Sequence, residues 1–416
     1  MADAGHFERR LAGSPLVYSI PPHRSFSDAL VSGLLATIGR DPVALARGRI
    51  ILPNNRAVRT ITEAFVRASD GGLLLPRLIA IGDPEIGERV GGELDPMDLE
   101  EEIPPSIDPL DRQLLLASRL RQDGESSAEA MRLAAQLART IDQLAIEEVP
   151  PSRLAEAVTA TPELAAHWLQ SIDRFRAILD GWPDLLAARG KIDLADRRSR
   201  LLHSLARKWE NRPPGGFTLA AGITTSGPAV AALLATIARL DRGAVVFAAL
   251  ADRSTMPEEE WEALGPDDAG RGEETHPQYH LKRLLDRVGV AREEVLQWRG
   301  AGRAASSRAR GLAIANALVA PSFSSKWMTL ASPERRLTGI RVAELPDPAS
   351  EAQAIAIALR EAIEIPGKTA ALVTPDRGLA TRVSAHLLRW GIEADDSAGQ
   401  PLSDAAAGTL LLAVIA

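Results

Sequence analysis

The tripeptide Gly367-Lys368-Thr369 has the composition that ends a phosphate-binding loop. In such loops, backbone N–H groups and a lysine hold the phosphates, while a Ser or Thr hydroxyl binds magnesium. Here Ala362 stands where the motif requires glycine, and the tripeptide precedes an expected strand instead of opening a helix. The pattern therefore favours a turn that enters a strand over a nucleotide site.

A phosphate loop is also absent where a nucleotide-binding α/β fold needs one, between the first strand and the first helix. That connection, residues 19–26, reads Ser-Ile-Pro-Pro-His-Arg-Ser-Phe and contains no glycine or lysine. Its two prolines remove backbone N–H donors and exclude positive φ angles. Magnesium would need an Asp-Glu pair after a later strand, but residues 220–226 read Ala-Ala-Gly-Ile-Thr-Thr-Ser. We therefore expect no catalytic residues and no cofactor in this chain.

Nucleic-acid binding is the chemistry that residues 51–59, Ile-Leu-Pro-Asn-Asn-Arg-Ala-Val-Arg, indicate. Residues 47–69 contain five arginines and one glutamate. Arginine neutralises phosphates, and asparagine amides can hydrogen-bond to phosphates or bases. The alternative is an ordinary helix cap followed by a solvated helix face, which the residues support about equally. The candidate DNA-binding residues of this stretch are Asn54, Asn55, Arg56 and Arg59.

A second polar stretch begins at His276 and reads His-Pro-Gln-Tyr-His. His276 and His280 have helical spacing and could bind a metal, but Pro277 disfavours a regular helix there and no carboxylate partner is evident. Capping and packing are favoured for these histidines, and no metal site is expected. Gln278 and Tyr279 join the candidate DNA-binding residues, because an amide can hydrogen-bond and an aromatic ring can stack on bases.

Two further polar clusters favour structural roles. Ser25 and Asp28 have the spacing of a helix-capping box, and no His or Asp follows in an order that would support a nucleophile. Glu258–Glu260 precede Trp261 and are typical of a solvated helix start.

Composition indicates a soluble globular protein of two or three domains, with 416 residues, 45% hydrophobic and 25% charged. The absence of cysteine excludes disulfides, thiolate zinc sites and iron–sulfur clusters in these residues, and fits a reducing compartment. We expect a cytoplasmic protein without a membrane partner, since no apolar run spans a bilayer and no signal peptide is evident. The net charge of −7 leaves a local basic groove possible.

Apolar patterns predict an α/β domain interrupted by helices. Strands are expected at 16–20, 49–52, 217–221 and 244–249, and helices at 27–38, 54–67 and 228–240. From 110 to 211, apolar residues recur at helical spacing and predict an all-helical insertion. Its stripes are Leu133, Leu137, Ile141 and Leu144, then Trp168, Ile172, Phe175 and Leu179. Residues 93–108 carry seven acidic side chains and no basic one, which predicts a solvated linker.

A second α/β domain is expected after a loosely structured basic stretch at 299–310. Its predicted strands are 340–345 and 370–374, and its helices are 351–363 and 380–390, the latter ended by Gly391. The final apolar residues have no polar helix cap, which we interpret as a truncated helix. The predicted divisions are 1–103 and 213–335 for the first α/β domain, 104–212 for the helical insertion, and 336–416 for the start of the second domain.

Several motifs, taken in order, resemble one family. Residues 370–397 resemble the fourth conserved motif of superfamily 1 helicases of the UvrD type, and residues 51–59 resemble their motif that touches the single-strand backbone. The whole set resembles the N-terminal part of AddB, the partner subunit of the AddAB helicase–nuclease, in its alphaproteobacterial form. The segments that carry this resemblance are Tyr18–Pro22, Ile51–Phe65, Leu75–Asp83, His276–Tyr279 and Val373–Leu402.

The resemblance implies a RecA-like parallel-sheet domain with a helical insertion, followed by the start of a second α/β domain. It implies a non-catalytic subunit that holds or scans a single strand while an AddA-type helicase–nuclease partner processes double-strand DNA ends for recombinational repair. The nucleotide-contacting arginine of active relatives falls on Thr374, with Arg377 three residues away. Relatives also carry a C-terminal nuclease domain with a four-cysteine iron–sulfur cluster, which these residues lack.

Two other functions stay open from the sequence. One is an active ATP-dependent superfamily 1 DNA helicase, and the other is a protein-interaction scaffold that does not bind DNA. Nucleotide binding would distinguish an active helicase from the non-catalytic subunit. Salt-dependent DNA binding would distinguish the non-catalytic subunit from the scaffold.

Overall fold

The chain divides into two compact units, residues 1–338 and 339–416, in a computed structural model. Most of the predicted acidic linker, the stripe through Trp168, Ile172 and Phe175, and residues 301–306 of the basic stretch lie outside the described residues. The structure describes residues 7, 13–39, 41–69, 72–82, 103–122, 126–153, 178–266, 272–300, 307–337, 339–399 and 401–415.

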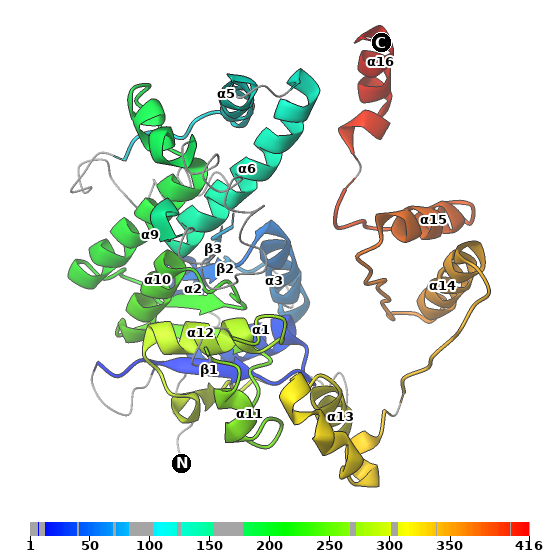
Figure 1. Cartoon of the computed structure of the whole chain (residues 1–416). Coiled ribbons are helices and arrows are strands. Elements are labelled where there is room, and N and C mark those ends of the chain that lie inside the picture. Colours follow the sequence, from blue (N-terminus) through cyan, green and yellow to red (C-terminus); the bar gives the residue numbers. More distant parts are fainter. Residues whose placement is uncertain are drawn as a thin grey trace. The chain divides into compact units, whose positions relative to one another are not determined.

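One parallel sheet of six strands forms the centre of the first unit (Figure 1). The strands are β1 (Val17–Ile20), β2 (Arg49–Leu52), β3 (Arg77–Ala80), β4 (Thr218–Ala221), β5 (Gly243–Ala248) and β6 (Leu296–Gln297). Their order is β3-β2-β4-β5-β1-β6, and every neighbouring pair is parallel. The predicted α/β fold and its four predicted strands are confirmed, while β3 and β6 add to them.

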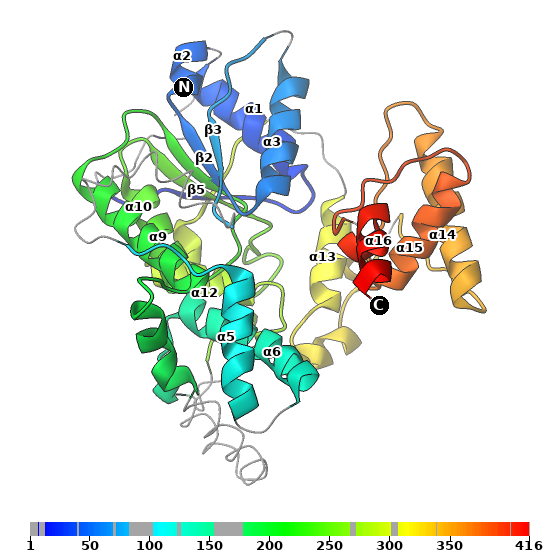
Figure 2. The same cartoon turned by 90° about the horizontal axis from the view of Figure 1, so that it is seen from above.

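Helices cover both faces of this sheet, because side chains alternate between the faces with a period of two. Tyr18 and Val246 point into the core beneath α1 and α3. Val17, Val245 and Phe247 point into the opposite core, beneath α9, α10 and α12. Figure 2 shows α1 and α3 on one side of the strands and α9 and α10 on the other. These helices are α1 (Phe26–Ile38), α3 (Asn55–Ala68), α9 (Leu194–Asn211), α10 (Pro228–Arg239) and α12 (Tyr279–Val288).

A helical segment lies between β3 and β4 in the chain, as predicted. Its helices α5 and α6 have their own core, in which Leu137 and Ile141 meet Trp182. α9, which the sequence places in the same insertion, instead packs on α10 and buries Leu205 and Trp209 in the core of the sheet. This core is formed by α5 (Pro109–Gln122), α6 (Ser127–Glu147) and the helical residues 178–187.

Short helices complete the described part of the first unit. α12 begins at Tyr279, two residues after Pro277, so the proline excludes His276 from the helix as expected. The short helices are α2 (Pro42–Ala46), η2 (Pro151–Arg153), α11 (Glu258–Glu262), η4 (Arg292–Glu294), α13 (Arg308–Ala317), η5 (Pro321–Met328) and η6 (Ser332–Arg335).

The second unit contains two packed helices and a terminal apolar helix. α14 and α15 confirm the predicted helices at 351–363 and 380–390, and share a small core that includes Ala356 and Val383. Gly391 ends α15 as predicted, with φ at 71° and its N–H bonded to the Leu388 carbonyl at 2.9 Å. Its helices are α14 (Pro348–Ile363), α15 (Arg377–Leu388), η7 (Leu402–Asp404) and α16 (Ala406–Ile415).

The predicted strands at 340–345 and 370–374 are wrong. Both segments are irregular, and Val342 and Val373 are 87% and 94% exposed. Parallel strands are stable when neighbouring strands pair with them and helices cover both faces. In the described part of this unit, α14 and α15 pack mainly on each other. Their apolar connections therefore remain extended and unpaired, and the expected β-α-β unit is a helix pair.

Candidate nucleic-acid interface

The carboxyl ends of all six strands meet at one edge of the sheet, because every pair is parallel. Ligands of open α/β sheets bind at this edge, outside the carboxyl ends of the strands. The connections that follow β2, β4, β5 and β1 leave the edge side by side, in that order. Both predicted DNA-binding stretches lie here, since Asn54 follows β2 and Gln278 contacts the loop that follows β5.

Asn54 caps helix α3. Its backbone is extended, with φ at −159°, and its Oδ1 accepts a hydrogen bond of 2.9 Å from the backbone N–H of Ala57. This geometry satisfies one of the N–H groups left without a partner at the start of a helix. The cap interpretation of Asn54 is therefore confirmed. It uses the oxygen of the amide, so the Nδ2 donors are not consumed by the cap.

Only some of the five arginines counted along residues 47–69 lie at this turn. Arg56 and Arg59 are exposed in the first two turns of α3. Arg67 lies near the other end of the helix, where it pairs with Asp28 at 2.7 Å. Arg49 is the first residue of β2, so it lies at the opposite, amino edge of the sheet. The basic character that this stretch brings to the carboxyl edge comes from Arg56 and Arg59.

The connection from β1 to α1 is held by hydrogen bonds between its own residues. The N–H of Arg24 bonds to the Pro21 carbonyl at 3.1 Å, and Ser25 Oγ donates to Asp28 Oδ2 at 2.8 Å. Ser25 makes no side-chain cap, so the predicted capping box is wrong, and Asp28 instead links α1 to α3. Burial alone would raise the pKa of Asp28. Hydrogen bonds from Arg67 and Ser25 outweigh this effect, so the net pKa of Asp28 is lowered.

An aromatic ring lies between the ends of β1 and β4. Phe26 is the first residue of α1, and Gly222 follows β4 with φ at 68°. A Cβ on Gly222 would lie 3.3 Å from Cε1 of Phe26, so the ring contacts this glycine directly. In nucleotide-binding α/β domains, phosphates and magnesium lie between the helix N-terminus and carboxylates at the strand ends. Here the ring of Phe26 approaches the end of β4, and no carboxylate follows that strand in residues 217–227.

The loop from β4 to α10 is fixed by residues distant in sequence. Ser226 is 3% exposed, and its Oγ lies 3.2 Å from Nδ1 of His280. The carbonyl of Ser226 accepts a hydrogen bond from Arg287 of α12. Arg287 also pairs with Glu147, the last residue of α6, at 3.2 Å. Sequence patterns did not single out Ser226, Arg287 or Glu147, because their partners lie 54 or more positions away.

Gln278 organises the loop that follows β5. Its Nε2 donates to the Ala249 carbonyl at 3.0 Å, and its Oε1 accepts from the Ala251 N–H at 2.9 Å. Ala249 has φ at 57°, a left-handed conformation that costs a residue with a Cβ about 1 kcal/mol. Gln278 therefore stabilises a strained turn at the carboxyl edge, and its amide is engaged with backbone.

Tyr279 is buried at the start of α12, with 7% of its surface exposed. Its hydroxyl donates to Glu274 at 3.5 Å, and its ring lies 5.3 Å from that of His280 in an edge-on arrangement. A base could not stack on this ring without displacing its neighbours. The burial of Tyr279 therefore argues against the predicted stacking role, and packing explains the residue.

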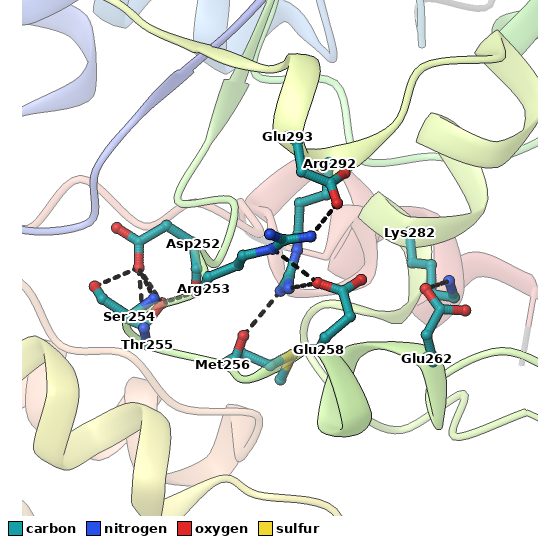
Figure 3. Close-up of polar contacts among 10 residues, drawn as sticks. All are labelled: Asp252, Arg253, Ser254, Thr255, Met256, Glu258, Glu262, Lys282, Arg292 and Glu293. Carbon is teal, nitrogen blue, oxygen red and sulfur yellow. Dashed lines mark hydrogen bonds and ion pairs between the residues drawn. The ribbon is translucent and has the colours of Figure 1, made fainter.

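Beyond β5, a network of charges joins the loop at 252–262 to α12 and η4 (Figure 3). Glu258 pairs with Arg253 at 3.1 Å and with Arg292 at 2.5 Å, and Arg253 also pairs with Glu293. The hydrogen bond from Arg292 is the main cause that lowers the pKa of Glu258. Glu260 is 7% exposed, so the prediction that Glu258–Glu260 form a solvated helix start is wrong for Glu260.

Two cations of this network, Arg292 and Lys282, pack on the ring of Trp261. Trp261 is 3% exposed, and its ring lies 4.8 Å from the Arg292 guanidinium carbon and 5.4 Å from Nζ of Lys282. Lys282 pairs with Glu262 at 3.1 Å, and these two side chains approach each other in Figure 3. Arg292 and Lys282 are thus each paired with a carboxylate and packed on the Trp261 ring, which stabilises residues 252–262.

His276 has the capping and packing role predicted for it. Its Nδ1 accepts a hydrogen bond of 3.1 Å from the Gln278 N–H, and 8% of its surface is exposed. Burial is the main cause that lowers its pKa. Within the described ranges, no three His, Asp or Glu side chains gather as a metal-binding group.

The motif-like residues of the second unit form turns and an ion pair. Gly367 has φ at 76°, and the N–H of Lys368 bonds to the Ile365 carbonyl at 3.0 Å, so Gly367-Lys368-Thr369 is a turn as predicted. The hydroxyl of Thr374 accepts from the Asp376 N–H at 3.1 Å. The guanidinium of Arg377 contacts both carboxylate oxygens of Asp396, at 2.9 and 2.8 Å.

Comparison with known proteins places the chain in no described family. No family model matches the sequence, and no curated protein matches it significantly. None of the helices in the described ranges is both long and apolar enough to cross a membrane. The parallel sheet and the residues at its carboxyl edge are the features that bear on function.

Proposed function

We propose that this chain is the non-catalytic, helicase-like part of a subunit that resembles AddB, and that it holds or scans single-stranded DNA while a partner motor processes double-strand ends. The observation that carries the proposal is the contrast along one edge of the sheet. The turn after β2 presents two exposed arginines and two asparagines, whereas the connections after β1 and β4 lack the groups that bind ATP and magnesium.

The strand order supports the finer fold assignment, a RecA-like domain. In such domains the strand that precedes the phosphate loop and the strand that precedes the magnesium-binding carboxylates are separated by one inserted strand. β1 and β4 occupy these positions here, with β5 between them. A helical segment also enters between β3 and β4, where the sequence pattern places an insertion in a helicase motor.

The chemistry of this edge supports a role without ATP hydrolysis. Pro21 and Pro22 supply no backbone N–H to a phosphate, and the ring of Phe26 packs near Gly222 after β4. Residues 19–26 contain no lysine and residues 217–227 contain no carboxylate, so the lysine of a phosphate loop and the carboxylates that hold magnesium are both missing from these connections.

DNA binding is supported by the exposure of Arg56 and Arg59 at the start of α3. Phosphate contacts by arginine and amide side chains make up the sequence-independent part of single-strand binding. The AddA-type partner, the role in recombinational repair and the cytoplasmic location follow from the family resemblance.

Two binding measurements on the whole chain test this function. Calorimetric titration with magnesium and ATP should give no saturable heat, whereas fluorescence anisotropy should detect a labelled single-stranded oligonucleotide at low salt. Micromolar ATP binding would favour the active helicase instead. Absence of single-strand binding at 50 mM salt or below would favour the interaction scaffold.

A further inference from the structure

The β4–α10 loop is held on its inner side by the helices beneath it. Ser226 is buried between His280 and Arg287, as described above for its hydroxyl and carbonyl. Gly227 allows the end of α6 to approach, since a Cβ there would lie 2.9 Å from the Ile146 carbonyl oxygen. The loop is therefore anchored on its inner side by contacts from α6 and α12.

The outer residues of this loop are Thr224 and Thr225, and both are exposed. Neither hydroxyl makes a hydrogen bond to another residue that the structure describes. Because Ile51 pairs with Ala220 in adjacent parallel strands, this loop leaves the sheet beside the turn that contains Asn54. Adjacent strands lie about 4.8 Å apart, so the two connections begin close together.

The charges near this loop are compatible with a polyanion. Residues 217–227 contain no carboxylate. On the inner side, Arg283 and Arg287 both contact Glu147, at 3.4 and 3.2 Å, so two cations face one anion. An Asp-Glu pair at this position would repel a phosphate, whereas threonine hydroxyls can donate hydrogen bonds to it.

We infer that Thr224 and Thr225 bind the phosphodiester backbone of single-stranded DNA and extend the path that begins at Arg56 and Arg59. This inference rests on the proposed function, because it assumes that the carboxyl edge receives a single strand. It adds a second contact point, built from neutral donors, at the strand end where an active motor would hold magnesium.

Removal of the two hydroxyls tests the inference. The double substitution Thr224→Val with Thr225→Val keeps side-chain shape and charge but removes both donors. Two hydrogen bonds of ordinary net strength correspond to a loss of roughly 5- to 140-fold in single-strand affinity. Because no charge changes, the slope of log affinity against log salt should stay as in the unsubstituted chain. The midpoint of thermal unfolding shows whether the hydroxyls stabilise the fold, and it should be the same in the valine variant as in the unsubstituted chain.

A charge-introducing pair, and a single charge introduced on a distant helix, complete the experiment. Thr224→Asp with Thr225→Asp should weaken binding more than the valine pair, whereas Thr140→Asp on the exposed face of α6 should leave affinity within about twofold. Unchanged binding by the valine pair, with binding reduced by Arg56→Ala and Arg59→Ala, would overturn the inference and leave the proposed function intact. Failure of the unsubstituted chain to bind would overturn both.

Discussion

Replacement of Arg56 and Arg59 by alanine isolates the electrostatic part of the predicted interface. Both side chains are exposed on the solvent face of α3, whose opposite face buries Ile61 and Phe65. The double substitution should therefore leave folding intact, since surface substitutions of this kind usually change stability by about 0.5 kcal/mol or less. The expected change is in how DNA affinity depends on salt.

The size of that change follows from counterion release. Each phosphate contact contributes about 0.7 to the slope of log affinity against log salt for a single strand, so two arginines contribute about 1.4. Between 50 and 200 mM salt, a fourfold increase, the unsubstituted chain should lose about sevenfold more affinity than the variant. The measurement is fluorescence anisotropy with one labelled oligonucleotide across a salt series.

A matched control removes the same charge elsewhere. Arg47 lies at the amino edge of the sheet and Arg139 on α6, and both are exposed. If Arg47→Ala with Arg139→Ala changed the slope as much as the Arg56 and Arg59 pair, net charge would explain the binding. The same slope in the Arg56 and Arg59 variant as in the unsubstituted chain would show that this turn does not contact phosphates.

Three stability predictions follow from single side chains. Gln278→Leu should lower the free energy of unfolding in urea by about 2–3 kcal/mol, because the Ala249 carbonyl and the Ala251 N–H lose their hydrogen-bond partner. His276→Gln should make stability less sensitive to acid. Since burial lowers the pKa of His276, its neutral form contributes fully above the unfolded pKa of about 6.5, and that contribution falls as pH drops below it. Unfolding midpoints at pH 8 and 5.5 measure this. Glu148, with φ at 55°, pairs with His203 at 2.6 Å, so Glu148→Gly should be about 1 kcal/mol more stable than Glu148→Ala in thermal unfolding.

Sequence patterns predicted the parts of the fold that depend on local apolar runs. β1, β2, β4 and β5 contain almost uninterrupted apolar residues, as strands buried on both faces require. β3 begins with the exposed Arg77 and β6 has only two residues, so neither has a distinct pattern. The segments around Val342 and Val373 have strand composition without paired neighbours, and composition alone cannot show whether a partner strand is present.

The candidate interface was predictable where chemistry is local. The cap by Asn54 follows from its position before an amphipathic helix, and the absence of a phosphate loop follows from Pro21 and Pro22. The role of Gln278 depends on its approach to Ala249, 29 positions away, which no local pattern reveals. Counting arginines along the chain also overstates the basic surface, because a strand separates Arg49 from Arg56 by its full length.

The contact between Phe26 and Gly222 has a consequence for attempts to rebuild a motor from this chain. Grafting a glycine-rich loop with its lysine, and a carboxylate pair after β4, would supply the missing charges but would leave the Phe26 ring against Gly222. Under the proposed function, restoring ATP binding would therefore require the first turn of α1 to be redesigned together with the loop opposite, because the two pack on each other.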